Sequence, residues 1–600
     1  MNTILGELGK SKKFVELIKN IEEKQSPIGI SGLSNVGMLE TIASINEYSK
    51  KPIAIITYNE IQAKWIMENI QFFTDKAIYF PKKDIVTYNY VAESKDLPYS
   101  RIEALNKINN KRNYILVTTI EAAMQKLPAK QLLYKNTLKF KVGEIHSLDK
   151  IKQNLVNLGY TRCDLIEGRG QFSLRGGILD ISINDAIGVR VEFWGDEIDS
   201  IRNFNIISQR SINTLEKVEI EPAHEYILEK PIEEICKKVR KTIANDEQEE
   251  IIEQDIEQIK AGNYISKIDK YFDCFYDKQE TIIDYLNTNS IITFDEIRKI
   301  EQRAQNIIKD NEQLIKNLIE KGKVVPQAIS NIQTFSSIEN TTKESKKTII
   351  YIEKQDTKIE RQAQNYNFQY RAINYYKSEI ETLFTDIKKA QEKGKNIYVV
   401  VATKEKAKKL QEILEQENIM SKIEEKLDKT IIVKSQEKII TIAIGKLTEG
   451  FENYEINQVI ISADELIEGG KKKKTFAHQA YKEGEKVVFA DLKIGDYVVH
   501  KNYGIGIYIG VNTITADGTT KDYIKLKYQN DDILYVPTNQ LDSIRKYNGG
   551  DTLNPPINKL GSKDWRETKE RVKKNLRAVA RELIELYAKR DKAKGHAFSK

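Results

Sequence analysis

Short apolar runs alternate with stretches of helical periodicity over the first 125 residues. The predicted strands are Ile53–Thr57, Ala77–Phe80 and Tyr114–Thr118. The predicted helices are Glu60–Phe73, Ser100–Asn110 and Ile120–Leu127. Brief apolar strands that alternate with helices are typical of a parallel sheet. Residues 1–128 are therefore predicted to form the first part of an α/β domain.

The pattern changes to the two-residue period of strands between residues 129 and 210. The predicted strands are Thr137–Lys141, Gln171–Leu174, Ile178–Ser182, Val189–Phe193 and Ile198–Phe204. One helix, Ser147–Leu158, interrupts them, so we expect a small inserted α+β domain. Residues 211–330 are helical and highly charged, and their isolated strand, Ile291–Phe294, is expected to complete the first sheet.

An α/β pattern returns over residues 345–465 and predicts a second small α/β domain, to which the sequence assigns no role. Its predicted strands are Thr348–Ile352, Ile397–Ala402, Ile439–Ile444 and Gln458–Ser462, with a long helix at Lys404–Asn418. Residues 466–488 follow as a linker with four consecutive lysines. A solvated hinge is the simple interpretation of these lysines, and a contact to DNA or to a protein partner is the alternative.

Residues 489–550 predict a small β-barrel of the SH3-like or Tudor-like kind. The predicted strands are Val498–His500, Gly506–Val511, Tyr523–Tyr528 and Ile533–Val536, with turn residues between them. The segment contains no group of nucleophile, base and orienting residue, which favours binding over catalysis; a pure packing module is the alternative. A long helix is predicted over 560–595. The fold class is thus multidomain α/β and α+β.

Composition agrees with a soluble globular protein: 40% of the 600 residues are hydrophobic and 30% are charged. No apolar run approaches the length of a membrane helix and no signal peptide is evident, so we expect a cytoplasmic protein without membrane contact. The three cysteines and five histidines are scattered, which predicts neither a disulfide framework nor a metal site. The net charge of +7 permits contact with nucleic acid but does not argue for it.

A glycine-rich loop at residues 32–39 has the spacing of a phosphate loop but not its chemistry. Gly32 and Gly37 match the two glycines of G-x-x-x-x-G-K-[ST], just before the predicted helix 40–48. Met38 replaces the lysine that would neutralise phosphates, and Leu39 replaces the hydroxyl that would hold magnesium. We therefore predict that residues 1–330 bind no ATP.

Two motifs in the inserted domain predict a protein-docking surface. Residues 168–181 include Arg175 before a Gly-Gly turn, and residues 189–198 include Arg190 and Trp194. Strand alternation places Arg190 and Trp194 on one face and the apolar residues between them on the other. An arginine beside an exposed aromatic residue is typical of an interface hot spot. In the alternative, Trp194 packs inward and the arginines pair with local acids.

These motifs, together with residues 495–506 and 531–537 of the barrel, resemble the bacterial transcription-repair coupling factors. The resemblance covers almost the whole chain and implies a front half similar to UvrB, with a decayed ATP site. It also implies a UvrA-binding surface with Arg175, Arg190 and Trp194, although the family often has phenylalanine at the last position. CarD-type regulators share the barrel, which the resemblance identifies as a module for the RNA polymerase β subunit. The resemblance places the barrel's contact with this subunit near Ile514. In the alternative, Ile514 serves only in burial.

UvrB itself is the nearest rival for the front half. It requires a working phosphate loop and a tyrosine-rich hairpin, and residues 87–94 leave little room for that hairpin before the helix at Ser100. The resemblance instead implies a protein that binds stalled RNA polymerase, displaces it by ATP-driven translocation on double-stranded DNA and recruits UvrA.

The translocase motor, with its ATP and magnesium, is expected outside these 600 residues. The chain ends on a segment, 595–600, that resembles the motor's opening, and the helix before it is expected to relay to the motor. The sequence thus leaves open whether the chain belongs to an enzyme, and we expect no cofactor and no catalytic residue within it. A monomer is expected, and a free-standing, non-catalytic adaptor between polymerase and excision repair is the alternative.

Overall fold

The computed structural model divides the chain into two compact units, residues 1–473 and 474–600. It describes residues 3–463 and 495–559 with internal gaps, the longer of which are 84–95, 261–267, 321–331, 374–379, 425–438, 538–543 and 548–556. The predicted linker 466–488, the segment 87–94 and, apart from Trp565, the predicted helix 560–595 lie outside the described residues.

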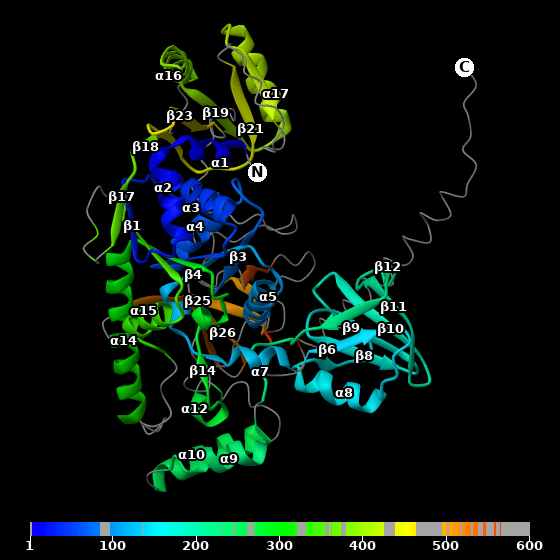
Figure 1. The fold of residues 1–600 in the computed structure, drawn as a ribbon. Coiled ribbons are helices and arrows are strands. Elements are labelled where there is room, and N and C mark those ends of the chain that lie inside the picture. The colour runs from blue at the N-terminus through cyan, green and yellow to red at the C-terminus, as the bar shows by residue number, and fades with distance from the viewer. Residues whose placement is uncertain are drawn as a thin grey trace, which may run out of the picture. The chain divides into compact units, whose positions relative to one another are not determined.

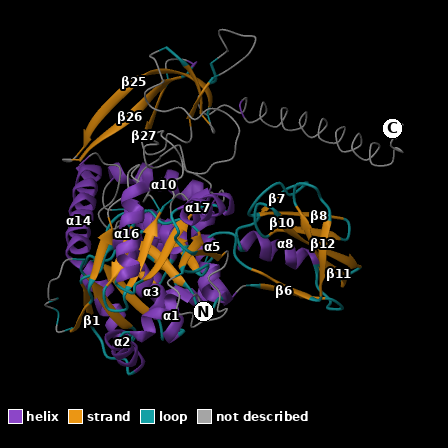
Figure 2. Ribbon diagram, turned by 90° about the horizontal axis from the view of Figure 1, so that it is seen from above, coloured by secondary structure: helices purple, strands orange, loops and turns teal. Residues whose placement is uncertain are grey.

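A parallel seven-stranded sheet forms the centre of the first unit (Figures 1 and 2). Its strands, in spatial order, are β17 (Gln364–Asn367), β1 (Ile28–Ser31), β16 (Thr348–Ile352), β15 (Ile291–Asp295), β2 (Ile53–Thr57), β4 (Ile115–Thr119) and β3 (Ala77–Phe80). As predicted, the strand near 291 completes this sheet. The strand Thr348–Ile352 also lies within it, between β1 and β15, and not in the second α/β domain. Its five apolar or β-branched residues indicate burial on both faces, but a local pattern cannot tell which sheet supplies that burial.

Helices cover both faces of this sheet, because alternate strand residues enter two different cores. Ile56 of β2 packs in one core and Ile55 in the other. The covering helices are α2 (Lys12–Glu22), α3 (Asn35–Ser49), α4 (Glu60–Ile70), α5 (Asp96–Asn110), α6 (Ile120–Met124), α14 (Ile297–Glu320) and α15 (Phe335–Glu344). The helix predicted over Ile120–Leu127 ends at Met124, since Leu127 and Pro128 form β5, which pairs with β14 (Gln279–Glu280).

The inserted domain is a six-stranded sheet covered by α8 (Leu148–Asn157). Its strands, in spatial order, are β12 (Ser211–Leu215), β11 (Glu197–Asn205), β10 (Ile187–Trp194), β9 (Ile178–Ser182), β8 (Gln171–Arg175) and β7 (Thr161–Arg162). A two-stranded sheet joins β6 (Leu138–Lys141) to β13 (Lys217–Ile220). The domain thus extends past the predicted boundary at 210. Strand β12 is almost entirely exposed and lacks the apolar alternation that marks a half-buried strand. Strand β13 does alternate, but over only four residues.

The chain then forms a small helical cluster before it returns to the central sheet. Helices α9 (Ile232–Arg240), α10 (Asp246–Lys260) and α12 (Phe272–Phe275) enclose a core of their own. This part agrees with the helical pattern predicted for the segment.

A second, mixed sheet follows in the first unit. Its strands, in spatial order, are β18 (Tyr370–Ile373), β22 (Gly450–Asn453), β23 (Gln458–Ser462), β19 (Asn396–Val401), β21 (Ile440–Ile444) and β20 (Ser421–Glu424). Helices α16 (Ile380–Glu392) and α17 (Lys404–Gln416) pack on one face. The other face shares a core with the central sheet, because Tyr398 and Phe451 pack together with Ile30 and Met38.

The second unit contains a five-stranded antiparallel sheet. Its strands, in spatial order, are β27 (Ile533–Pro537), β26 (Thr519–Lys527), β25 (Gly504–Ala516), β24 (Tyr497–His500) and β28 (Ile544–Lys546). Val498, Ile524, Leu526 and Val536 lie in its core. All four predicted strands are present, and β25 continues five residues beyond the predicted end at Val511.

Candidate docking surface and the loop before α3

The three residues predicted for the docking surface of the inserted domain lie on one face of its sheet. Helix α8 covers the other face, where Ile151 packs with Phe172 and Val191 in one core (Figure 1). Because neighbouring strand residues point to opposite faces, Arg190 and Trp194 of β10 lie on the face away from α8. We call this face the outer face.

Strand register decides which side chains are neighbours on the outer face. Arg175 of β8 is paired with Ile178 of β9, which is paired in turn with Glu192 of β10. One row further along, Asp180 is paired with Arg190. The register therefore brings two arginines from different strands to the same carboxylate.

The buried carboxylate of Asp180 lies between these two arginines. Nε and Nη2 of Arg190 donate hydrogen bonds to its oxygens at 2.7 and 2.9 Å, and Nη2 of Arg175 lies 3.6 Å from Oδ2. The Arg190 guanidinium also lies 4.5 Å from the centroid of the Phe204 ring. Its side-chain hydrogen bonds to Asp180 raise the pKa of Arg190 above the ordinary value. Arg190 is thus held in one geometry as a cation.

The three predicted residues differ in accessibility. Trp194 is 85% exposed and the Arg175 side chain 55%, whereas only 19% of the Arg190 side chain is exposed. The alternative in which Trp194 packs inward is therefore wrong, while both arginines do pair with a local acid. A partner can contact Trp194 and Arg175 directly.

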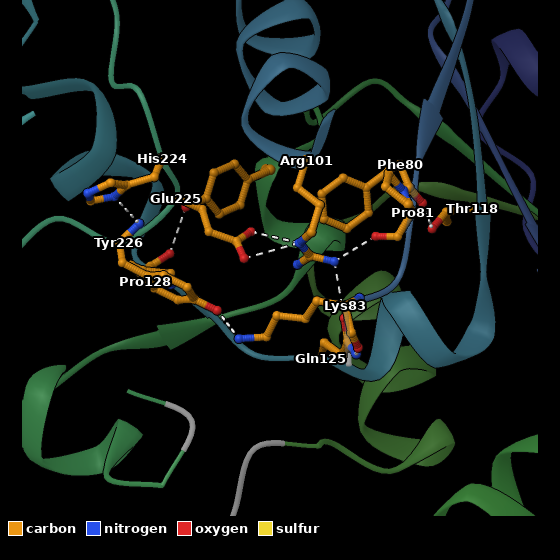
Figure 3. Close-up of polar contacts among 11 residues, drawn as sticks. Phe80, Pro81, Lys83, Arg101, Thr118, Gln125, Pro128, His224, Glu225 and Tyr226 are labelled. Carbon is orange, nitrogen blue, oxygen red and sulfur yellow. Dashed lines mark hydrogen bonds and ion pairs between the residues drawn. The ribbon is translucent and has the colours of Figure 1, made fainter. Parts of the chain in front are cut away.

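A buried ion pair anchors the segment that leaves the inserted domain (Figure 3). Nε of Arg101 donates to both carboxylate oxygens of Glu225 at 2.9 and 3.1 Å. Nη1 of Arg101 donates to the Pro81 carbonyl at 2.7 Å and to Oε1 of Gln125 at 3.1 Å. The guanidinium lies 4.3 Å from the centroid of the Phe80 ring. Sequence reasoning missed this anchor, because no motif distinguishes Arg101 from the other basic residues of a helix.

The neighbouring His224 is partly buried and has a packing role. A side chain added at Gly159 would overlap its ring, so the glycine makes room for it. Burial lowers the pKa of His224 to about 4, which leaves the ring neutral at physiological pH.

Gly32 lies in the short connection between β1 and α3. The helix begins at Asn35 and not at the predicted residue 40, so Gly37 lies in its first turn. Both glycines contact the segment 366–370. Oγ of Ser34 caps the helix by accepting a hydrogen bond from the Gly37 amide at 3.1 Å. A side chain added at Gly32 would overlap the Phe368 carbonyl, and one added at Gly37 would overlap the Tyr370 ring. The Tyr370 amide also donates to the Gly32 carbonyl at 3.0 Å. Both glycines thus permit a close approach of the segment 366–370.

Tyr370 reaches into the first turns of α3. Its hydroxyl donates to Oε2 of Glu40 at 2.9 Å and lies 3.3 Å from Oγ1 of Thr41. Glu40 is fully buried, and this burial raises its pKa to about 8. Met38 and Leu39, which stand where a phosphate loop has lysine and a hydroxyl, are fully buried in the core.

In the second unit, Ile514 lies in the long hairpin of β25 and β26. It is paired with Lys521 and lies two residues before the end of β25 at Ala516. The orientation of its side chain lies outside what the structure describes. On the edge strand β27, Ile533 and Tyr535 are exposed, and Nζ of Lys525 lies 5.6 Å from the centroid of the Tyr535 ring.

Two segments of the chain match known domain families. Residues 138–226 match the UvrB interaction domain, and residues 492–548 match the CarD-like/TRCF RID domain. A transcription-repair-coupling factor from Bacillus subtilis is 29% identical over 617 aligned residues, which cover 100% of this chain and 52% of the relative. The chain is homologous to the transcription-repair-coupling factors. The predicted resemblance is thereby confirmed.

Further transcription-repair-coupling factors show the same extent of similarity. One from Staphylococcus aureus is 29% identical, covering 95% of this chain and 49% of its own length, and one from Staphylococcus epidermidis is 28% identical, covering 96% and 50%. The chain therefore spans about half the length of the curated relatives it matches. The UvrB interaction domain match extends past residue 210, as the inserted sheet does.

Two further features concern the described residues alone. Within 3–463 and 495–559, apart from the gaps, no helix has the length and apolar character needed to cross a membrane. The same residues bring together no group of three or more histidine, cysteine, aspartate or glutamate side chains that could hold a metal ion.

Proposed function

We propose that this chain couples transcription to excision repair by presenting two docking surfaces, one for UvrA and one for RNA polymerase. The observation that carries the proposal is the presence of both matched domains in one chain that is homologous to the transcription-repair-coupling factors over its whole length. The outer face of the inserted sheet is the proposed UvrA surface, and the domain at 492–548 is the proposed polymerase surface.

The outer face offers UvrA an apolar contact beside fixed positive charge. Burial of Trp194 supplies most of the gain in free energy, because a large exposed aromatic side chain loses contact with water on binding. Arg175 is accessible and can form a charge-assisted hydrogen bond to a carboxylate of the partner. Arg190 acts chiefly by position, since Asp180 already holds its guanidinium.

The hairpin of β25 and β26 is proposed to contact the polymerase β subunit through Ile514. Ile514 lies near the end of a long hairpin, beyond the residues of β25 that pair with β24, and an apolar residue at such a position suits contact with a partner. In the alternative, Ile514 serves only in burial, which a thermal unfolding measurement on Ile514→Arg distinguishes from loss of binding.

We propose further that residues 1–330 bind no nucleotide. A phosphate group needs free backbone amides and a cation at the start of the helix, but Oγ of Ser34 takes the Gly37 amide and the Tyr370 ring lies against Gly37. Met38 supplies no charge. Displacement of polymerase along double-stranded DNA, with ATP and magnesium, is proposed as an activity of a motor outside these residues. The free-standing adaptor remains the alternative.

Two variants in otherwise identical chains test the assignment of the two surfaces. Arg175→Ala combined with Trp194→Ala is expected to weaken binding to UvrA by about 100-fold, given hot-spot losses of about 1–2 kcal/mol each. It should leave polymerase binding unchanged. Ile514→Arg should have the converse effect. Arg190 is left intact because its removal would strand the buried Asp180 carboxylate. Unchanged affinity for UvrA in the double variant would overturn the first assignment.

A stalled transcription complex tests the role of ATP. The 600-residue chain is expected to bind the complex without releasing the polymerase, whether or not ATP is present. Tight binding of a fluorescent ATP analogue to residues 1–330, or ATP-dependent release by this chain alone, would contradict the proposal.

A further inference from the structure

Ile145, in the connection between β6 and α8, is exposed at the same end of the sheet as Trp194. It forms an isolated antiparallel bridge with Glu197, which is paired with Trp194 across the turn between β10 and β11. Ile145 is 77% exposed and Trp194 is 85% exposed. The large apolar side chains of Ile145 and Trp194 thus lie on either side of Glu197. This row of paired residues is next to the row that contains Arg175 and Ile178.

The backbone holds Ile145 in place although its side chain faces solvent. The Gly143 amide donates to the Ile198 carbonyl at 2.8 Å, and the Ile198 amide donates to the Glu144 carbonyl at 2.9 Å. The His146 amide donates to the Asp196 carbonyl at 2.8 Å. Three backbone hydrogen bonds therefore fix the segment 143–146 against the turn that carries Trp194. A backbone segment that is already fixed loses little further backbone freedom when its partner binds.

We propose that Ile145 is a second apolar anchor of the UvrA surface and enters the same apolar socket of UvrA as Trp194. The inference rests on the proposed function, because it extends the surface that contains Arg175 and Trp194. Continuity supports it: all of these residues lie in the segment that matches the UvrB interaction domain. A cluster of exposed large apolar side chains is also a mark of a protein interaction site.

Charge around the two anchors specifies the socket further. Four acidic residues are exposed near Ile145 and Trp194: Glu144, Asp196, Glu197 and Asp199. Arg175 of β8 lies on the other side of Trp194, across the strands of the sheet. A complementary socket on UvrA would have basic residues at its Ile145 side and a carboxylate at its Arg175 side.

Ile207 provides a matched control within the same domain. It is 86% exposed and follows the far end of β11, whereas Glu197 and the bridge to Ile145 are at the near end. The nine residues of β11 separate the two ends by roughly 26 Å, at the usual rise per strand residue. Both isoleucines expose similar apolar area, but only Ile145 lies beside Trp194.

Binding of purified UvrA to four forms of the full 600-residue chain tests the inference: the wild type, Ile145→Ser, Ile145→Leu and Ile207→Ser. We expect Ile145→Ser to raise the Kd about 10-fold, because it removes a large apolar side chain from the interface. Ile145→Leu should stay within about twofold of wild type because it keeps the apolar volume. Ile207→Ser should bind as wild type, and all forms should unfold at the same temperature.

The double variant Arg175→Ala with Trp194→Ala separates the role of Ile145 from the assignment of the UvrA surface as a whole. If it weakens binding while Ile145→Ser does not, the role of Ile145 is overturned and the UvrA surface stands. If neither weakens binding, the UvrA surface itself is wrong. Equal weakening by Ile207→Ser and Ile145→Ser would also overturn the placement of the anchor.

Discussion

The buried carboxylate of Asp180 organises the outer face of the inserted sheet. It accepts both hydrogen bonds of the Arg190 guanidinium and attracts Arg175, so that one acid fixes two cations from neighbouring strands. Paired arginines on a surface repel each other unless an anion lies between them. Asp180 is therefore a positioning residue for the proposed UvrA surface, although the partner cannot reach it.

Asp180→Asn should weaken both the local fold and UvrA binding. The neutral amide cannot balance the charge of two guanidinium groups. The loss of this hydrogen-bonded, largely buried charge pair costs about 2 kcal/mol. Hydrogen exchange of the β8, β9 and β10 amides measures this cost locally, which suits a chain of several domains. Asp185→Asn is the control, since Asp185 pairs with Arg169 at the surface and should change exchange little. Unchanged exchange in Asp180→Asn would contradict the role of Asp180.

Glu40 makes the stability of the first unit depend on pH. Its folded pKa is about 8 and its ordinary value is 4.5, so the folded state binds the proton more tightly than the unfolded state. The stabilisation is fully present below about pH 4.5 and is lost as pH rises through 8. Glu40→Gln removes this dependence while it can still accept the Tyr370 hydrogen bond.

Comparison of Glu40→Gln with wild type at several pH values measures the effect. The difference in thermal unfolding temperature, variant minus wild type, should become more positive between pH 5.5 and pH 8.5. Subtraction cancels the contributions of other titrating groups. A difference that is constant over this range would show that Glu40 is not protonated in the folded state.

At the scale of elements, segments far apart in sequence hold each other in place. The segment 366–370 covers the loop before α3, and the segment that leaves β13 is anchored on α5 through Arg101 and Glu225. The first contact joins the central sheet to the second sheet. The second fixes the path by which the chain returns from the inserted domain. Both contacts are buried, so the loss of a polar partner in either of them is costly.

Arg101→Met should be among the most destabilising single substitutions in the first unit. It leaves the Glu225 carboxylate buried without its partner, at a cost of about 3–5 kcal/mol. Combination with Glu225→Leu should recover much of this loss, because the pair is then replaced by apolar side chains. Limited proteolysis of the connection at 221–231 detects the loosening. Arg303→Met, at a partly exposed pair with Glu121, is the control and should have a small effect.

The sequence predicted most helices and strands of the molecule but not which of them lie side by side. Ile53–Thr57 and Ile291–Phe294 were recognisable as strands because burial on both faces requires continuous apolar residues. Thr348–Ile352 has the same pattern, yet its place between β1 and β15 depends on long-range pairing. The glycine spacing at Gly32 and Gly37 indicated a close approach, but not that Tyr370 makes it.

At the scale of the whole molecule, the two proposed surfaces lie in different compact units. The UvrA surface belongs to the unit 1–473 and the polymerase surface to the unit 474–600. The residues proposed for one partner are therefore absent from the other unit. Binding of one partner therefore leaves the residues proposed to contact the second partner unoccupied.

The mass of the complex that forms when the chain is mixed with both UvrA and RNA polymerase tests this claim most directly. Light scattering coupled to size-exclusion chromatography should show one species that contains all three proteins. Arg175→Ala with Trp194→Ala should reduce it to chain and polymerase, and Ile514→Arg should reduce it to chain and UvrA. Two separate binary complexes with the wild-type chain, and no species containing both partners, would contradict the account.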